Sequence, residues 1–136
     1  MIYLDSTTRK LQAFLAGAVA TTQPQITVHY YDVPSQTKPT FEDYRGAMYE
    51  EETNGATAVD ICPAPSGNGT TRNVQHICVH NKDTASVTVT IVVDDSGTDR
   101  YLKTSTLTAN QSLIYEHGQG WQVLYQTASG APTVAT

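Results

Sequence analysis

From residue 57 onward, short β-type stretches are separated by turn-forming residues, and this pattern restricts the folds that the chain can adopt. Residues 94–97 and 118–120 have the compositions of hairpin turns. Strands spaced at roughly 8–12 residues with turn signals between them are typical of sandwiches and jelly rolls. We therefore predict an all-β fold, a β-sandwich or jelly roll. One strand has a clear alternating apolar face, formed by Val87, Val89, Ile91 and Val93.

The remaining composition agrees with this fold class. The chain has 136 residues, 15% of them charged, with eight tyrosines. β-Branched and aromatic side chains pack well on a pleated sheet, and a chain of this size buries about two-thirds of its unfolded surface. We predict one sandwich domain over residues 25–125, without internal repeats. Its predicted strands are residues 25–33, 58–62, 74–80, 86–93, 100–107, 113–116 and 121–125.

Residues 1–24 are predicted to form an extended arm outside the domain. The helical alternative rests on apolar residues that fit a helical spacing, namely Leu11, Phe14, Leu15, Ala18 and Val19. The extended form is favoured, because Gly17 costs a helix about 1 kcal/mol and its neighbours are small and β-tolerant. Residues 34–56 are predicted to be an irregular acidic excursion, and residues 126–136 a polar tail.

The charge distribution argues against two classes of partner. Seven acidic and two basic side chains between residues 32 and 60 account for the whole net charge of −5. Without a basic stripe, neither nucleic acid nor an anionic membrane surface is expected as a partner. No stretch approaches 18 apolar residues and no secretion signal opens the chain, so we expect synthesis in the cytoplasm.

No residue pattern predicts catalysis, a cofactor or a metal. His76 and His80 lie about 13 Å apart along a strand, too far to share an ion unaided. The acidic residues at 94–99 lack the spacing of a calcium loop and are read as a hairpin tip. Cys62 and Cys78 are expected to be buried free thiols, with a disulfide as the alternative. The chain is therefore predicted not to be an enzyme.

Aromatic side chains suggest a binding surface instead. Exposed tyrosines give large contact area at low entropy cost. Four tyrosines are predicted to be interface residues. Two of them, Tyr30 and Tyr31, lie on the predicted strand 25–33, and the other two, Tyr44 and Tyr49, lie in the acidic excursion. Trp121, which follows a Gly-Gln-Gly turn, is expected to pack over one end of the sandwich.

Several segments resemble one family, the short virion structural proteins encoded among the head genes of tailed phages. The similar segments are residues 7–11, 53–61, 80–89, 107–113 and 115–123. In the second of these an Asn-Gly pair precedes a strand. In the third, Asn81-Lys82-Asp83-Thr84 forms a hairpin turn, and the last two resemble the family's closing strand pair. The likeness lies in structural turns and covers most of the chain.

The resemblance is to capsid decoration, or cement, proteins, which are β-sandwich or jelly-roll modules that bind the outside of a shell. It implies a virion protein on the capsid surface, a homo-oligomer (dimer or trimer) and the phage's major capsid protein as partner. An extended arm could add a strand to a neighbour's sheet edge. The additional contact residues this implies are Tyr3, Leu4, Leu11, Phe14 and Leu15 in the arm, and Met48 in the excursion.

Two alternatives from other classes remain open. A tail, head–tail connector or fibre-base component would share the fold and differ in copy number and position. A carbohydrate-binding module for host attachment would use Trp121 and tyrosines.

Overall fold

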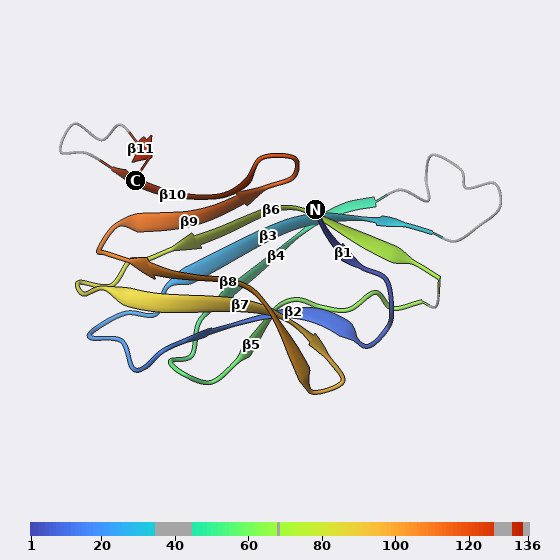
Figure 1. The fold of residues 1–136 in the computed structure, drawn as a ribbon, viewed down its shortest axis with the longest axis horizontal. Helices are drawn as coiled ribbons and strands as arrows, with labels where there is room; N and C mark the ends of the chain where they lie inside the picture. Colours follow the sequence, from blue (N-terminus) through green and yellow to red (C-terminus); the bar gives the residue numbers. More distant parts are fainter. Residues whose placement is uncertain (35–44, 68, 127–131, 135–136) are drawn as a thin grey trace.

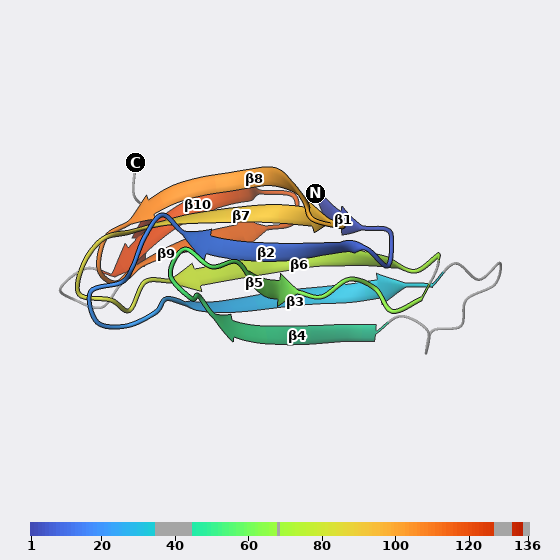
Figure 2. The same ribbon diagram turned by 90° about the horizontal axis from the view of Figure 1, so that it is seen from below.

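The computed structural model describes residues 1–34, 45–67, 69–126 and 132–134. Two antiparallel β-sheets pack face to face as a β-sandwich (Figure 1, Figure 2), which confirms the all-β prediction. In the described ranges, no helix is long and apolar enough to cross a membrane. The strands are β1 Ile2–Leu4, β2 Arg9–Leu15, β3 Gln25–Val33, β4 Arg45–Glu52, β5 Val59–Cys62, β6 Thr71–His80, β7 Val87–Asp95, β8 Thr98–Leu107, β9 Gln111–Glu116, β10 Gly120–Gln126 and β11 Pro132–Val134.

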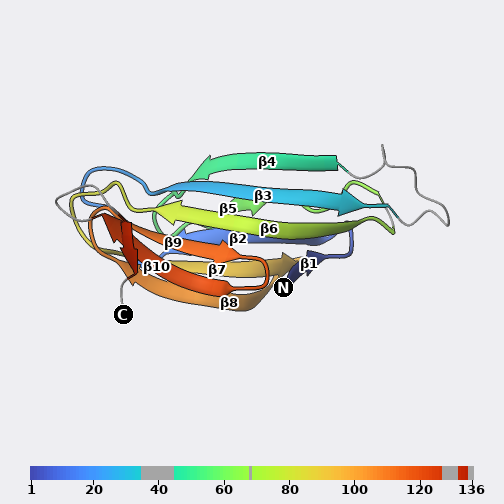
Figure 3. The same cartoon turned by 90° about the horizontal axis from the view of Figure 1, so that it is seen from above.

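The larger sheet has the order β11-β10-β9-β6-β3-β4, and the smaller sheet has the order β5-β2-β7-β8. Strand β1 pairs with the start of β6, whereas β9 pairs with its end. β1 and β9 therefore lie one after the other along the same side of β6. In the view from above, β4 and β8 lie at opposite edges of the molecule (Figure 3).

The core lies between the sheets, where the alternating apolar residues of each strand meet. In the smaller sheet, Ala13 of β2 is paired with Ile91 of β7, and both are fully buried. Burial of a large aliphatic side chain such as that of Ile91 contributes about 1.5–3 kcal/mol. The larger sheet contributes mainly Ile26, Val28, Ile77, Val79 and Leu113.

The prediction of an N-terminal arm is wrong for residues 1–15. β1 and β2 belong to different sheets, and each is paired with central strands of the fold. The apolar residues Leu11, Ala13 and Leu15 alternate along β2 and face the core. Leu11 and Leu15 also fit a helical spacing, so the period-two pattern was hidden. Residues 16–24 then cross from the smaller sheet to the larger one.

The acidic excursion and the tail also contain regular structure. Residues 45–52 form β4, which pairs along its whole length with β3. The run Glu50-Glu51-Glu52 is compatible with a strand because an edge strand leaves charged side chains in water. In the expected tail, Pro132–Val134 forms β11 and pairs with β10. The strands predicted between residues 25 and 125 are all present, most of them one to three residues longer at an end.

Candidate interaction surface

Three of the ten predicted contact residues are core residues. Leu4 and Leu11 are fully buried, and Leu15 is 2% exposed. They face the space between the sheets, so they stabilise the sandwich and are closed to a partner. These three predictions are wrong, because the strands β1 and β2 took the place of the expected arm.

Three other predicted residues meet on one surface, the face of the larger sheet that points away from the smaller sheet. We call this the outer face. Tyr31 of β3 pairs with Asn73 of β6, and Asn73 pairs with Tyr3 of β1, so the three form one cross-strand row. Met48 of β4 lies in the next row of the same face. Tyr3 is 47% exposed and Met48 is 52% exposed.

The remaining predicted residues lie elsewhere. Tyr30 packs against the core beneath Arg72, whose guanidinium carbon lies 4.1 Å from the ring centre. Tyr49 is half-buried and pairs with the core residue Val28. Phe14 lies on the outside of the smaller sheet, at a ring-centre distance of 6.2 Å from Tyr101. Tyr44 lies outside the described residues.

The Met48 row also contains residues that the sequence interpretation missed. Met48 pairs with His29, His29 with His76, and His76 with Glu116, in four successive strands. The rings of His29 and His76 are 5.6 Å apart between centres at an interplanar angle of 73°. His76 Nδ1 lies 2.6 Å from Glu116 Oε1. Alternation along 25–33 predicts that His29 faces outward, but only the register of β3 against β6 brings it opposite His76.

The outside of the smaller sheet exposes a second, smaller apolar group. Tyr101 is 68% exposed and Leu102 is 36% exposed. Leu102 is the extra residue of a β-bulge, because Tyr101 pairs with Val92 and Lys103 pairs with Ile91. A bulge interrupts the backbone pattern that an added strand would need. The β8 edge is therefore less suited to strand pairing than the unbulged β4 edge.

An ion pair joins the buried Arg72 of β6 to the half-buried Asp32 of β3. Arg72 Nε and Nη2 donate to the two carboxylate oxygens of Asp32 at 2.8 and 2.9 Å, and Nη1 donates to the Pro63 carbonyl at 2.6 Å. Arg72 is 7% exposed. The neighbouring thiol of Cys62 is fully buried, and burial raises its pKa to about 11. A thiol with so high a pKa is a packing residue and not a nucleophile.

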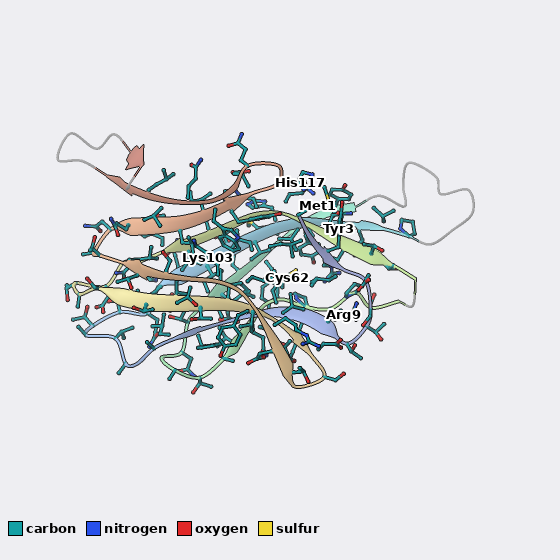
Figure 4. All side chains as sticks on the ribbon, viewed as in Figure 1. Met1, Tyr3, Arg9, Cys62, Lys103 and His117 are labelled. Atoms are coloured by element: carbon teal, nitrogen blue, oxygen red, sulfur yellow. The ribbon has the colours of Figure 1, made fainter. Side chains whose placement is uncertain are left out.

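Both cysteines are free thiols, as expected. Cys62 faces the core of the smaller sheet, whereas Cys78 lies on the outer face of the larger one, paired with Thr27. Their side chains point into different environments, and a disulfide between them would require rebuilding both sheets. Figure 4 shows Cys62 between the sheets.

The other sequence patterns form structural contacts. In the 94–97 turn, the Gly97 amide donates to Asp94 Oδ1 at 3.0 Å, which supports the hairpin reading. Trp121 packs against the core and lies 5.1 Å from Tyr115 between ring centres, so its predicted packing role is confirmed. Across the described part of the chain, no three His, Cys, Asp or Glu side chains gather closely enough to hold a metal.

A shallow hollow of about 380 Å³ lies along β3 and β4. All its charged lining residues are acidic, namely Glu50, Glu51 and Glu52. The hollow therefore fits a cationic or neutral group better than an anion.

Comparisons with known proteins add no relative to this description. The chain has no match among protein-family models, curated proteins or solved structures. The class that the fold defines is a β-sandwich of two antiparallel sheets.

Proposed function

We propose that this chain is a structural protein of a tailed-phage particle, and specifically a capsid decoration protein that binds the outside of the major capsid shell. The observation that carries the proposal is the gathering of Tyr3, Tyr31 and Met48 on one outer face. These residues come from three separate strands, and the sequence alone predicts all three as contact residues. An exposed face with aromatic and Met side chains is typical of protein interfaces.

The edge strand β4 supplies a second element of the proposed interface. All eight of its residues pair with β3 in unbroken register, and among the described residues no strand pairs with its other side. A regular, unpaired edge accepts an added strand through main-chain hydrogen bonds. The edge carries Glu50, Glu51 and Glu52, so a basic strand or segment of the shell would complement it. This edge takes over the strand-addition role predicted for the N-terminal arm.

The segments that carry the family resemblance support a structural role. Asn81 and Asp83, from the Asn-x-Asp-Thr turn, are buried and bind backbone groups of other loops. The side chains of this turn therefore tie distant segments of the chain together by hydrogen bonds. The finer assignment of a jelly roll, and of a homodimer or homotrimer on the shell, forms part of the same proposal.

Decoration by many copies needs only weak individual contacts. When hundreds of copies bind a symmetric shell, a few kcal/mol at each contact suffices to tie neighbouring capsomers together. A partly polar outer face of modest apolar content fits this requirement. A tail or connector position would use the same surfaces at a lower copy number.

The test is binding to purified shells that lack this protein. We expect Tyr3→Ala combined with Met48→Ala to weaken binding at least tenfold, because both side chains would lose buried contacts. The control is Tyr101→Ala, which removes a tyrosine that is even more exposed than Tyr3, 68% against 47%, from the outside of the smaller sheet. Wild-type binding by the double variant, or an equal loss for the control, would contradict the proposed surface.

A further inference from the structure

We propose that His29 and His76 form a two-histidine chelating site for a divalent transition-metal ion of the Cu²⁺, Ni²⁺ or Zn²⁺ type. The site lies on the outer face of the larger sheet. It is independent of the proposed function, since it rests on the geometry of these two strands alone.

The sheet register creates the site. His29 and His76 are directly paired residues of adjacent antiparallel strands, so their side chains project from the same face. Their ring centres are 5.6 Å apart. With metal–nitrogen bonds of about 2.0–2.1 Å, two imidazoles on one ion have ring centres about 5–6 Å apart. The observed separation of the ring centres therefore falls within the range for two imidazoles that share one ion.

Glu116 prepares one of the two ligands. His76 Nδ1 and Glu116 Oε1 are 2.6 Å apart. A carboxylate oxygen only accepts hydrogen bonds, so Nδ1 carries a proton, and in the neutral imidazole Nε2 then keeps its lone pair for a metal. Carboxylate–histidine–metal relays of this kind fix the tautomer and raise the basicity of the ligating nitrogen. Glu116 is thus a positioning residue for the site.

The surroundings favour an exchangeable ion rather than a structural one. His29 is exposed and His76 is half-buried, so water reaches the site from one side. Met48 pairs with His29 on the side away from His76, and its thioether is a soft donor that favours Cu(I) over Cu²⁺. With two nitrogen ligands from the chain, the remaining coordination positions belong to water or to a donor on a docked protein.

The experiment is calorimetric titration of the full chain, freed of any affinity tag, with Cu²⁺, Ni²⁺ and Zn²⁺ salts. We expect one ion per chain, bound most tightly as Cu²⁺. His29→Ala and His76→Ala should each weaken binding at least tenfold, and Glu116→Gln by about tenfold. The matched control is His80→Ala, on the same strand and face, whose Nδ1 lies 2.7 Å from Ser112 Oγ.

A second readout identifies the ligands directly. The electron paramagnetic resonance spectrum of the Cu²⁺ complex should show two equatorial nitrogens in the wild type and one in either single variant. All these side chains lie on the sheet surface, so the variants should keep the wild-type circular dichroism spectrum. Absence of wild-type binding, or a loss in His80→Ala equal to that in His76→Ala, would overturn the proposal.

Discussion

Asn81 Nδ2 lies 3.0 Å from the carbonyl oxygen of Leu107, a hydrogen bond that joins the end of β6 in one sheet to the end of β8 in the other. The same amide donates to the carbonyls of Ala85 and Thr108 at 2.9 and 3.1 Å. The side-chain oxygen accepts from the Asp83 amide at 3.0 Å. One fully buried side chain thus satisfies backbone groups of two segments, residues 83–85 and residues 107–108.

Replacing this side chain should destabilise the fold strongly. Asn81→Ala leaves buried carbonyls without donors, and each such group costs about 1–3 kcal/mol. We expect the free energy of unfolding, measured by urea denaturation, to fall by about 2–4 kcal/mol. Asn54→Ala, at an exposed position, should change it by less than about 0.5 kcal/mol. Equal stabilities of the two variants would show that the bonds of Asn81 do not hold the sheets together.

Asp83 should make stability depend on pH in the acid range. Burial raises its pKa, but hydrogen bonds from the Thr21 hydroxyl and from the amides of Ala20, Thr21 and Thr22 outweigh burial and hold the pKa well below its usual range. A lowered pKa contributes stability that is complete above the unfolded value, about 3.9, and is lost as the pH falls toward the folded value.

The corresponding experiment compares the wild type with Asp83→Asn across the acid range. The variant should have a lower urea midpoint at pH 7. The difference should shrink as the pH falls below about 4, because the carboxylate then protonates in the unfolded chain while it stays charged in the folded protein. Asp99→Asn, in the exposed β7–β8 hairpin, serves as the control. A difference that stays constant from pH 7 to pH 2 would mean that the charge of Asp83 has no part in the network.

A substitution at Leu11 tests whether residues 9–15 form a core strand or an arm. Leu11→Ala removes a fully buried side chain and should lower the free energy of unfolding by about 2–5 kcal/mol. Thr7→Ala, in the exposed turn before β2, should leave it within about 0.5 kcal/mol. If Leu11→Ala kept wild-type stability but lost binding to shells, residues 9–15 would form a binding arm and not the core strand β2.

The pair formed by Arg72 and Asp32 should show strong coupling. Asp32→Ala leaves the buried guanidinium without its counter-ion, which costs about 3 kcal/mol or more. Met at position 72 replaces the charge by an apolar chain, so Arg72→Met combined with Asp32→Ala should cost less than the two single changes summed. A double-mutant cycle should give a coupling energy of about 1–3 kcal/mol. A value near zero would indicate that the two residues act separately.

The sequence predicted most strands where alternation was strict, as in β7, because Val87, Val89 and Ile91 have no competing helical interpretation. It failed at β2, where Leu11 and Leu15 fit both periods, and at β4, where an acidic run on an edge strand resembles a loop. Local patterns do not show which strands are neighbours. They therefore do not predict that residues 1–15 belong to two sheets.

The interface is predicted only in part, because local patterns do not show which strands are neighbours. Tyr3, Tyr31 and Met48 were identified by residue type, and the fold brings them to one face. The pairing of His29 with His76 depends on the β3–β6 register, in which Gln75 is the extra residue of a bulge. A shift of one residue would move His76 to the other face, so no local pattern contains this contact.

The most direct test of the central claim is the copy number and position of the chain in purified particles of the phage that encodes it. Quantitative mass spectrometry combined with cryo-electron microscopy gives both values. We expect hundreds of copies on the capsid exterior, with the outer face of the larger sheet toward the shell. A few copies at one vertex would place the protein in the tail or connector, and its absence from particles would contradict a virion role.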